Sequence, residues 1–312
     1  MIEAKMLYKN FGASVAVNDI SFTIPDGQIT GVLGRPGCGK STVANILAGY
    51  TASSGGSVTI NGYDIERHPR RAKAAIGYLP ANNPIYYDMT VREYLVFLSR
   101  LPRRQIPERI AWVSDIMGIS EYLPRLILNL DRGVIRRIGI AGALINDPPI
   151  LLLDQPTAGL SPGDTREIRE ILKSLRQDRT MVIFSGSLSE ILDLCQHVLV
   201  LNSGKLIAND SIANLRALAG DKNRLKLSLQ AAPGQLRQIF SSMEGIEDVN
   251  AQPGLEEGTL DVILESDVDT DLRPQVWAVC NKENIPILEM KYLNVSLEEI
   301  VLQLTGKIQG GD

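Results

Sequence analysis

The sequence is poor in the residues that hold metals or form disulfide frameworks. Of its 312 residues, three are cysteines, far apart at Cys38, Cys195 and Cys280, and two are histidines. Neither a disulfide framework nor a metal-ligand cluster is therefore expected. Apolar runs are also short, because Ile150–Leu153 has four residues whereas a membrane span needs about 20. The N-terminus carries no apolar signal segment, so we expect a cytosolic protein that spans no membrane by itself.

The net charge of the chain is small as well. The 32 Lys and Arg residues against 36 Asp and Glu residues give a net charge of -4, too small to indicate a nucleic-acid-binding protein or a polybasic membrane anchor. No nucleic-acid partner is expected. With 44% hydrophobic and 22% charged residues, the composition is that of a globular chain, long enough for one large domain or two of common size.

Short apolar runs alternate with helical patterns over residues 1 to about 215. This alternation indicates an α/β core with a parallel sheet and crossover helices. A mostly helical block, about 85–145, interrupts it and opens with Thr90-Val-Arg-Glu93, the pattern of a capping box. A polar stretch near residue 220 then marks a boundary, which predicts domains at 1–219 and 220–312.

The second domain is predicted to be a small α+β unit of ferredoxin-like type. Its pattern indicates strands at 225–229, 246–250, 259–264 and 287–291 with helices at 234–243 and 272–283. Ser296 begins a capping pattern for a last amphipathic helix. This domain has no cluster of His, Cys or paired catalytic groups, which favours docking or dimerisation over an active site.

The strongest chemical signal is a glycine-rich phosphate loop. Residues 34–42 match G-x-x-x-x-G-K-[ST] between a predicted strand and a predicted helix. Such a loop turns its amides toward phosphates, and the following helix adds positive potential. Lys40 is expected to reach the β and γ phosphates, and the hydroxyl of Ser41 to bind Mg²⁺. The predicted nucleotide-binding residues here are Gly34, Gly37, Cys38, Gly39, Lys40, Ser41 and Thr42.

A second element supports a nucleotide site. The apolar strand Ile150–Leu153 ends in Asp154, which is expected to hold Mg²⁺ through water. Alone, a buried strand with a terminal Asp is common, but after a complete phosphate loop it becomes specific.

The order of four segments resembles the nucleotide-binding subunit of an ABC transporter over residues 2 to about 215. They are Gly34–Thr42, Ile76–Pro80, Leu130–Gly133 and Leu153–Leu160. One cassette followed by a small mixed domain is similar to the drug-resistance and gliding-motility type. The resemblance implies a P-loop NTPase cassette that binds ATP and Mg²⁺, pairs with a second cassette as a homodimer or heterodimer, and docks through its helical block on a separate membrane permease. It also implies a cytoplasmic location, peripheral on the inner face of the membrane.

The resemblance also assigns two further sets of residues. Phe11 takes the position of the aromatic that stacks on adenine, with a plain core residue as the alternative. Leu130, Asp131, Arg132 and Gly133 take the position of the signature loop, whose Ser and Gly amides grip the γ phosphate on the opposite subunit.

Five positions depart from the family's pattern. Ala81 replaces a Gln that senses Mg²⁺ and water, and Asn82 beside it is a poor substitute. Gln155 replaces the Glu that polarises water and cannot accept a proton at neutral pH. Gly186, or Ser187 in the shifted register, replaces the switch His, Ser161 replaces an Asp, and Asp131 replaces the signature Ser. As a helix N-cap, Asp131 is expected to weaken the grip on phosphate.

Intact binding motifs with several altered catalytic positions predict an ATP-binding subunit with strongly reduced hydrolysis. A homodimer and a heterodimer would both keep altered ATP sites. The site with Lys40 lacks its glutamate, and the ATP site of a partner subunit would face Asp131. The alternative function is a non-hydrolysing regulatory or scaffold subunit of a membrane or gliding-motility type complex. Another residue could act as the general base in place of the missing glutamate. Asp164, Glu167 and Glu190 are the candidates, although solvated acids on helices are the simpler interpretation of these residues. A DNA-repair or translation-type ABC protein would predict a coiled-coil insertion or a second cassette, and neither pattern occurs.

Overall fold

The computed structural model describes residues 1–100, 107–218, 222–230, 236, 239–240, 243, 245–254, 258–267 and 271–293. It divides into two compact units, Met1–Ile212 and Ala213–Asp312. The sequence places the boundary near 220, so helix α8 (Ile212–Leu218) falls mostly in the second unit rather than the first. The final helix expected from Ser296 lies outside the described residues.

A six-stranded sheet forms the centre of the first unit, in the order β10-β9-β3-β8-β7-β6. Strand β3 pairs in parallel with β8 and β9, and β7 pairs in parallel with β6 and β8, while β10 is antiparallel to β9. The strands are β3 (Ile29–Leu33), β6 (Ile76–Leu79), β7 (Ile150–Asp154), β8 (Thr180–Ser185), β9 (His197–Asn202) and β10 (Lys205–Ser211). Since parallel strands end at one edge, the residues after β3, β7 and β8 come together there.

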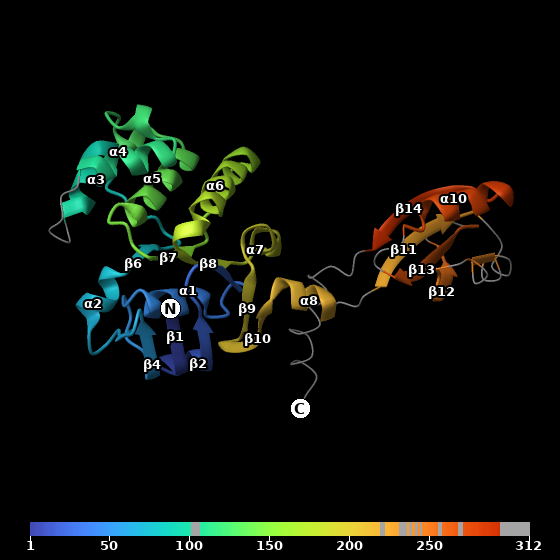
Figure 1. Ribbon diagram of the computed structural model, residues 1–312, viewed down its shortest axis with the longest axis horizontal. Helices are drawn as coiled ribbons and strands as arrows, with labels where there is room; N and C mark the ends of the chain where they lie inside the picture. Colours follow the sequence, from blue (N-terminus) through green and yellow to red (C-terminus); the bar gives the residue numbers. More distant parts are fainter. Residues whose placement is uncertain are drawn as a thin grey trace. The chain divides into compact units, whose positions relative to one another are not determined.

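A second, antiparallel sheet was not predicted from the sequence. Its order is β2-β1-β4-β5, with strands at β1 (Ile2–Phe11), β2 (Ser14–Ile24), β4 (Gly55–Ile60) and β5 (Tyr63–Asp64). Helix α1 (Lys40–Leu47) lies between the two sheets, and its apolar side chains share one buried core with both (Figure 1). The alternating burial along β2 is typical of a sheet with one covered face, a pattern that the parallel-sheet interpretation overlooked.

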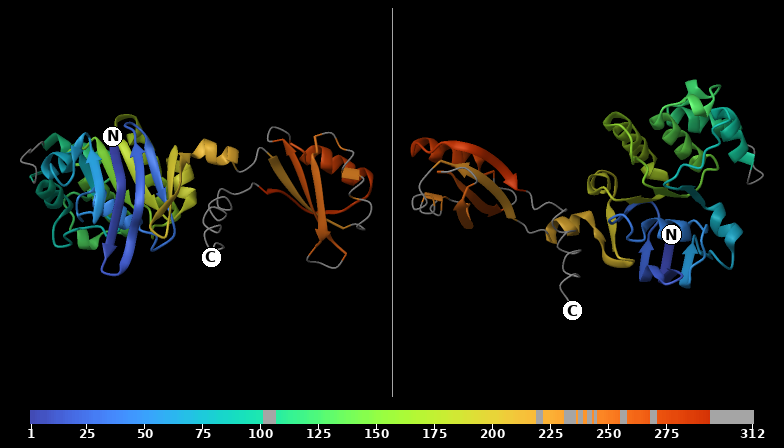
Figure 2. Two further views of the ribbon diagram at one scale, coloured as in Figure 1. Left: turned by 90° about the horizontal axis from the view of Figure 1, so that it is seen from below. Right: turned by 180° about the vertical axis from the view of Figure 1, so that it is seen from behind.

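The predicted helical subdomain is present beside the parallel sheet. It contains α3 (Val91–Arg100), α4 (Pro107–Ile116), α5 (Arg132–Leu144) and 3₁₀ turns at Ser120–Tyr122 and Ile127–Asn129. Figure 2 shows these helices grouped on one side of the first unit, away from β1 and β2. The predicted capping box is confirmed, because Thr90 N donates to Glu93 Oε2 at 2.8 Å and Glu93 N donates to Thr90 Oγ1 at 3.2 Å.

The remaining helices of this unit pack around the sheets. They are α2 (Pro69–Ala74), α6 (Pro162–Ser174), the 3₁₀ turn Leu175–Asp178 and α7 (Leu188–Leu194). Helix α7 lies close against β3, since a Cβ built on Gly31 would meet Ile191 Cδ1 at 2.7 Å. None of the helices in the described part of the chain is long and apolar enough to cross a membrane.

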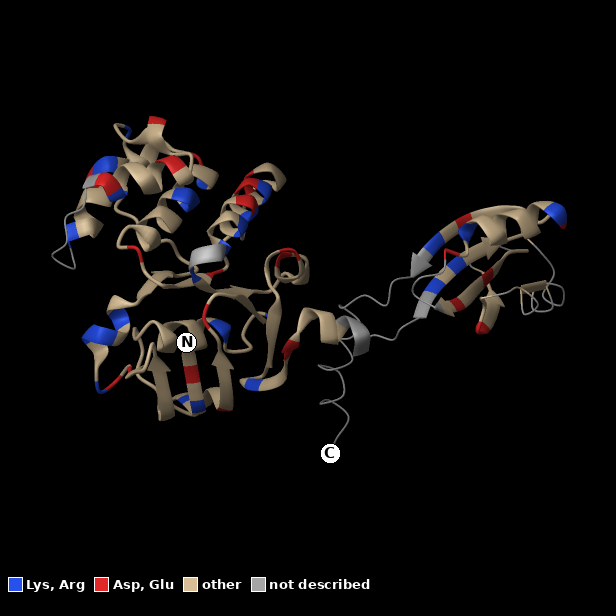
Figure 3. Ribbon diagram, in the orientation of Figure 1, with Lys and Arg blue, Asp and Glu red and all other residues tan. Residues whose placement is uncertain are grey.

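The second unit holds a four-stranded antiparallel sheet in the order β12-β13-β11-β14. Its elements are β11 (Lys222–Leu229), β12 (Asp248–Pro253), β13 (Leu260–Asp267), α10 (Arg273–Lys282) and β14 (Ile287–Leu293). They follow in the chain order that the sequence predicts, although the helix expected at 234–243 lies largely outside the described residues. Basic and acidic residues interleave on this sheet (Figure 3), with ion pairs such as Lys226–Asp261 at 2.8 Å.

Candidate functional site

The phosphate loop connects β3 to α1 and has the tight backbone that its glycines predict. Gly37 and Gly39 have φ angles of 81° and 103°, which glycine adopts without strain. A Cβ on Gly39 would collide with the carbonyl oxygen of Ala16, and one on Gly34 would lie 2.5 Å from the carbonyl oxygen of Leu201. These approaches fix the loop against neighbouring strands, so its shape is set before any ligand binds.

Lys40 begins helix α1 and turns its ammonium back over the loop. Its Nζ donates to the carbonyl oxygens of Gly34 at 2.7 Å and Arg35 at 2.9 Å, and lies 3.7 Å from Cys38 Sγ. The side chain is 6% exposed, and these partners are all neutral. A buried cation held by neutral groups has capacity for an anion.

Asp154 ends β7 beside the phosphate loop. It is 1% exposed, and its Oδ1 has no hydrogen-bond partner among the described residues. Burial raises the pKa of its carboxyl group, while a hydrogen bond with Ser41 and the charges of Lys40 and Arg136 oppose that rise. A buried carboxylate oxygen without a partner beside a hydroxyl is a donor set suited to a hard cation such as Mg²⁺.

Arg136 is a buried residue of this site that the sequence analysis missed. From α5 its guanidinium donates to the carbonyl oxygens of Asp154 and Gln155 at 2.7 Å and of Pro156 at 3.0 Å. It also donates at 3.3 Å to the carbonyls of Pro80 and Ala81. Burial lowers the pKa of Arg136, opposed by the charges of Asp154 and Glu190. One side chain therefore ties the loops after β6 and β7 to the helical subdomain.

The altered positions lie around this site as expected from the parallel sheet. Gln155 follows Asp154 directly, has a φ angle of 52°, and donates its backbone N–H to the carbonyl oxygen of Phe184 at 2.8 Å. Gly186 follows β8, where a Cβ would lie 3.6 Å from the carbonyl oxygen of Gly34. Ala81 follows β6 and is exposed. Position 155 therefore lacks the carboxylate, position 186 the imidazole and position 81 the amide that the family pattern has there.

The signature-loop residues surround the start of α5. Asp131 is at the N-cap position, as expected, but its side chain makes no capping hydrogen bond within the described chain. The expectation that its carboxylate caps the helix terminus is therefore wrong in that detail. Leu130 and Arg132 flank it, and Arg132 is exposed. Gly133 is buried, and a Cβ there would collide with the carboxylate of Asp164 from α6.

The three acids considered as alternative bases are all engaged elsewhere. Ser161 Oγ donates to Asp164 Oδ2 at 2.6 Å, and Glu167 pairs with Arg137 at 3.3 Å. Glu190 is 2% exposed, so its interpretation as a solvated helix acid is wrong. Each of its oxygens accepts a hydroxyl at 2.5 Å, from Thr157 and from Ser185. A carboxylate occupied and covered in this way is poorly placed to take a proton from water.

Phe11 ends β1 and is 55% exposed, with Lys9 Nζ 4.9 Å from the ring centroid. The alternative that it is a core residue is therefore wrong, and the exposed ring can contact a ligand.

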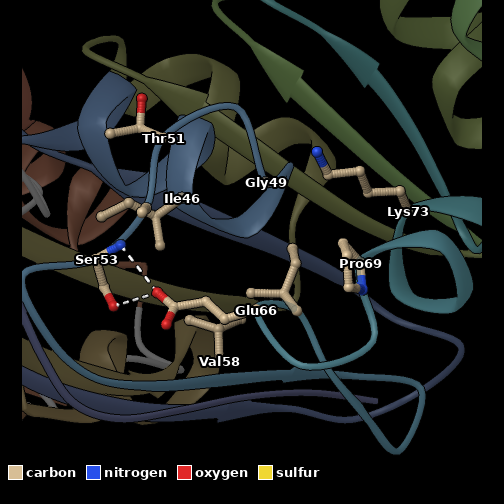
Figure 4. A pocket seen from close by; sticks show the side chains of 10 residues that line it. Ile46, Gly49, Thr51, Ser53, Val58, Glu66, Pro69 and Lys73 are labelled. Carbon is tan, nitrogen blue, oxygen red and sulfur yellow. Dashed lines mark hydrogen bonds between the residues drawn. The ribbon is translucent and has the colours of Figure 1, made fainter.

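A separate cavity of about 360 Å³ lies at the opposite end of α1 from the phosphate loop. Figure 4 shows Glu66, bound to Ser53, at one part of its wall and Lys73 at another, and apolar side chains such as Ile46 and Val58 also line it. None of the predicted nucleotide-binding residues lines this cavity. The nucleotide hypothesis therefore depends on the loop and on Asp154.

Comparison with known proteins gives one family model and many relatives. The family model described as ABC transporter matches residues 17–158. Two similar proteins are from Bacillus subtilis (strain 168). The linearmycin resistance ATP-binding protein LnrL is 27% identical over 98% of this chain and 99% of its own length. The ABC transporter ATP-binding protein NatA is 34% identical over 64% of this chain and 83% of its own length.

Solved structures agree on the fold. A dimeric cassette in a post-hydrolysis state, bound to ADP and Pi, is 22% identical and covers 68% of this chain and 99% of its own, with a TM-score of 0.63. A structure described as the ATP binding subunit of an ABC transporter is 20% identical over 70% of this chain and 92% of its own, with a TM-score of 0.64.

Proposed function

Because this chain belongs to the ATP-binding proteins of ABC transporters, we propose that it binds Mg-ATP at residues 34–42 and hydrolyses it weakly or not at all. The observation that carries the proposal is the presence at one site of two buried charged groups whose hydrogen-bond partners are neutral or missing. The buried ammonium of Lys40 bonds to neutral groups, and the buried Oδ1 of Asp154 has no partner among the described residues. An anionic phosphate and a divalent cation satisfy these two needs together.

Each residue of the site has a role in this proposal. The amides of Gly37 and Gly39 and the ammonium of Lys40 hold phosphate, and the exposed ring of Phe11 stacks on the base. Cys38 and Thr42 contribute their backbones to the loop. Ser41 binds Mg²⁺ directly and Asp154 holds it through water. When bound, the ion would neutralise phosphate charge.

In this proposal the chain binds the nucleotide but hydrolyses it poorly. Gln155 follows Asp154 where a general base is required, and its amide accepts no proton at neutral pH. Gly186 faces the phosphate loop without an imidazole, and Asp131 brings negative charge to the helix terminus that would meet a second cassette's phosphate. The acids at 164, 167 and 190 are engaged with other groups.

The assembly follows from the family and is likewise proposed. The chain pairs with a second cassette, either a copy of itself or another subunit, and docks on a separate transmembrane permease through its helical subdomain. This places it at the inner face of the membrane. The similarity to a linearmycin resistance protein over nearly the whole chain supports the drug-resistance type of transporter.

Two measurements test the proposal. Calorimetric titration with Mg-ATP is expected to show binding by the wild type and, for Lys40→Ala, an affinity at least about tenfold lower, since a charge-assisted hydrogen bond is lost. Lys73→Ala, which removes an exposed lysine remote from the loop, is the matched control and leaves the affinity unchanged. Equal affinities for the wild type and Lys40→Ala would overturn the proposed site.

Steady-state phosphate release then distinguishes the two candidate functions. Gln155→Glu is expected to raise release by roughly 10² to 10⁴ if the missing base limits it. A wild type that binds Mg-ATP yet releases phosphate no faster than Lys40→Ala supports the second candidate, a non-hydrolysing regulatory or scaffold subunit. Gln155, which has no carboxylate, and Gly186, which has no imidazole, favour that candidate. Release by the wild type well above Lys40→Ala supports a transport ATPase.

A further inference from the structure

Two helices of the first unit begin with the same sequence pattern and use its glutamate differently. In Thr90-Val-Arg-Glu93 the glutamate is exposed and bonds back to Thr90, whose N–H and Oγ1 donate to Glu93 Oε2 at 2.8 and 2.9 Å. This reciprocal arrangement is the usual capping box. Ser187-Leu-Ser-Glu190, at the start of α7, has the spacing for the same box.

The Glu190 carboxylate does not accept a hydrogen bond from the backbone N–H of Ser187, as a capping box would require. Its backbone N–H donates to Ser187 Oγ at 3.4 Å, but the N–H of Ser187 donates instead to Ser185 Oγ at 3.0 Å. The Glu190 carboxylate turns inward and accepts Ser185 Oγ and Thr157 Oγ1, each at 2.5 Å. A carboxylate that leaves an exposed capping role for a buried position needs strong partners, and two short hydroxyl bonds supply them.

The two hydroxyls come from different segments, one at the end of β8 and one in the loop after β7. Ser185 ends β8 and precedes Gly186, which lies against the carbonyl oxygen of Gly34. Thr157 lies two residues after Gln155 in the loop that follows β7. That same carbonyl of Gly34 accepts Lys40 Nζ. Glu190 therefore joins a loop in contact with the phosphate site to the loop that carries Gln155.

We propose that Glu190 is a positioning residue that couples loop 155–160 to loop 185–187 through Thr157 and Ser185. This brace adds a side-chain link between two loops that the pairing of β7 with β8, and the hydrogen bond from the Gln155 N–H to the carbonyl oxygen of Phe184, already bring side by side. Its effect on nucleotide binding rests on the proposed function, whereas the brace itself exists without nucleotide.

The test uses hydrogen exchange of the full chain without nucleotide. Thr157→Val keeps the shape of the side chain and removes its hydroxyl, and Ser185→Ala removes the other. Each variant is expected to speed exchange about tenfold or more in both loops, including the amides of Gln155 and Ser187, because a hydrogen bond to a charged group is lost. The double variant is expected to add little to either single variant.

Two controls separate coupling from general loosening. Thr157→Ser restores a hydroxyl and is expected to restore slow exchange in loop 185–187. Ser189 lies on the same helix, where its Oγ contacts Ser187 Oγ at 3.0 Å rather than Glu190. Ser189→Ala is therefore expected to leave hydrogen exchange in loop 155–160 unchanged. If Thr157→Val loosens its own loop alone, or if Thr157→Ser exchanges as fast as Thr157→Val, the coupling is overturned.

The same proteins measured with Mg-ATP keep this inference apart from the proposed function. A wild type whose residues 34–42 gain no protection contradicts nucleotide binding, while coupled exchange in the nucleotide-free protein still supports the brace. If residues 34–42 gain protection, we expect loops 155–160 and 185–187 to gain it together in the wild type. In Thr157→Val we expect residues 34–42 to keep this protection and loop 155–160 to lose it. Protection of 155–160 that is the same in Thr157→Val as in the wild type overturns the coupling.

Discussion

The guanidinium of Arg136 donates a 2.7 Å hydrogen bond to the carbonyl oxygen of Asp154, the residue whose side chain borders the phosphate loop. The same guanidinium reaches Ala81 after β6. Its backbone contacts thus place two strand ends relative to each other, although Arg136 contributes no group that could take a proton. In this protein the position of the candidate Mg²⁺ ligand depends on a side chain from the helical subdomain.

Replacing Arg136 by lysine should therefore destabilise the protein. A lysine has three donors at one point, so several of the buried carbonyls would lose their partner, and we expect a loss of about 2–4 kcal/mol in the free energy of unfolding. Urea unfolding measures it. Arg137→Lys is the matched control, because Arg137 pairs with an exposed glutamate and such pairs contribute about 0–1 kcal/mol. Equal effects of the two substitutions would contradict the clamp.

Gly133 should be sensitive to a single methyl group. A Cβ there meets the Asp164 carboxylate, which must turn away from Ser161, so Gly133→Ala is expected to lower the free energy of unfolding by up to about 1 kcal/mol despite its gain in helix propensity. Asp164→Ala removes the carboxylate that the new Cβ would meet. The free energy of unfolding of the double variant, Gly133→Ala with Asp164→Ala, should therefore be closer to that of Asp164→Ala than the sum of the single effects predicts. Thermal or urea unfolding of the four proteins measures this cycle. Additive effects would show that the collision is relieved elsewhere.

Sequence reasoning worked where a pattern is local. The phosphate loop lies between β3 and α1, the apolar run 150–154 forms β7, and Thr90–Glu93 caps α3. In each case the residues that decide the structure are within a few positions of one another, so spacing alone identifies them. The chain order of strands in the second unit was predictable for the same reason.

It failed where the partner is distant in the chain. Glu190 has the pattern of an exposed capping residue, but its carboxylate binds Thr157, 33 residues earlier. Arg136 reaches carbonyls as far as 56 residues away, and a buried arginine bound to backbone oxygens has no sequence signal. The antiparallel sheet was missed for two reasons: β4 returns to pair with β1 across roughly fifty residues, and the local hairpin of β1 and β2, in which Phe11 pairs with Ser14, was overlooked. Tertiary contacts decided the first two cases and part of the third.

Glu93 should make stability depend on pH. Hydrogen bonds from the backbone and then the side chain of Thr90 lower the pKa of Glu93 below its usual value of 4.5. A depressed pKa in the folded state adds stability above the unfolded value, and this stability is lost as pH falls through the folded pKa. Glu93→Gln should thus be less stable than wild type at pH 7, and in urea unfolding this deficit should shrink as pH falls toward 3.

Glu121→Gln, an exposed substitution in the same subdomain, is the control for that measurement. It should follow the wild type at both pH values. A Glu93→Gln deficit that is as large near pH 3 as at pH 7 would mean that the charge of Glu93 does not strengthen the cap.

Removing Mg²⁺ should affect nucleotide binding through Asp154. Its unpartnered Oδ1 and the neighbouring Ser41 form the expected cation site, so the wild type should bind ATP more tightly with Mg²⁺ than with EDTA. Asp154→Asn removes a charge that attracts the ion, so the ratio of the two affinities should fall below that of the wild type, while Ser41 still supplies a direct ligand. Asp164→Asn is the matched control and should keep the wild-type ratio. An unchanged ratio in Asp154→Asn would place the cation on other ligands.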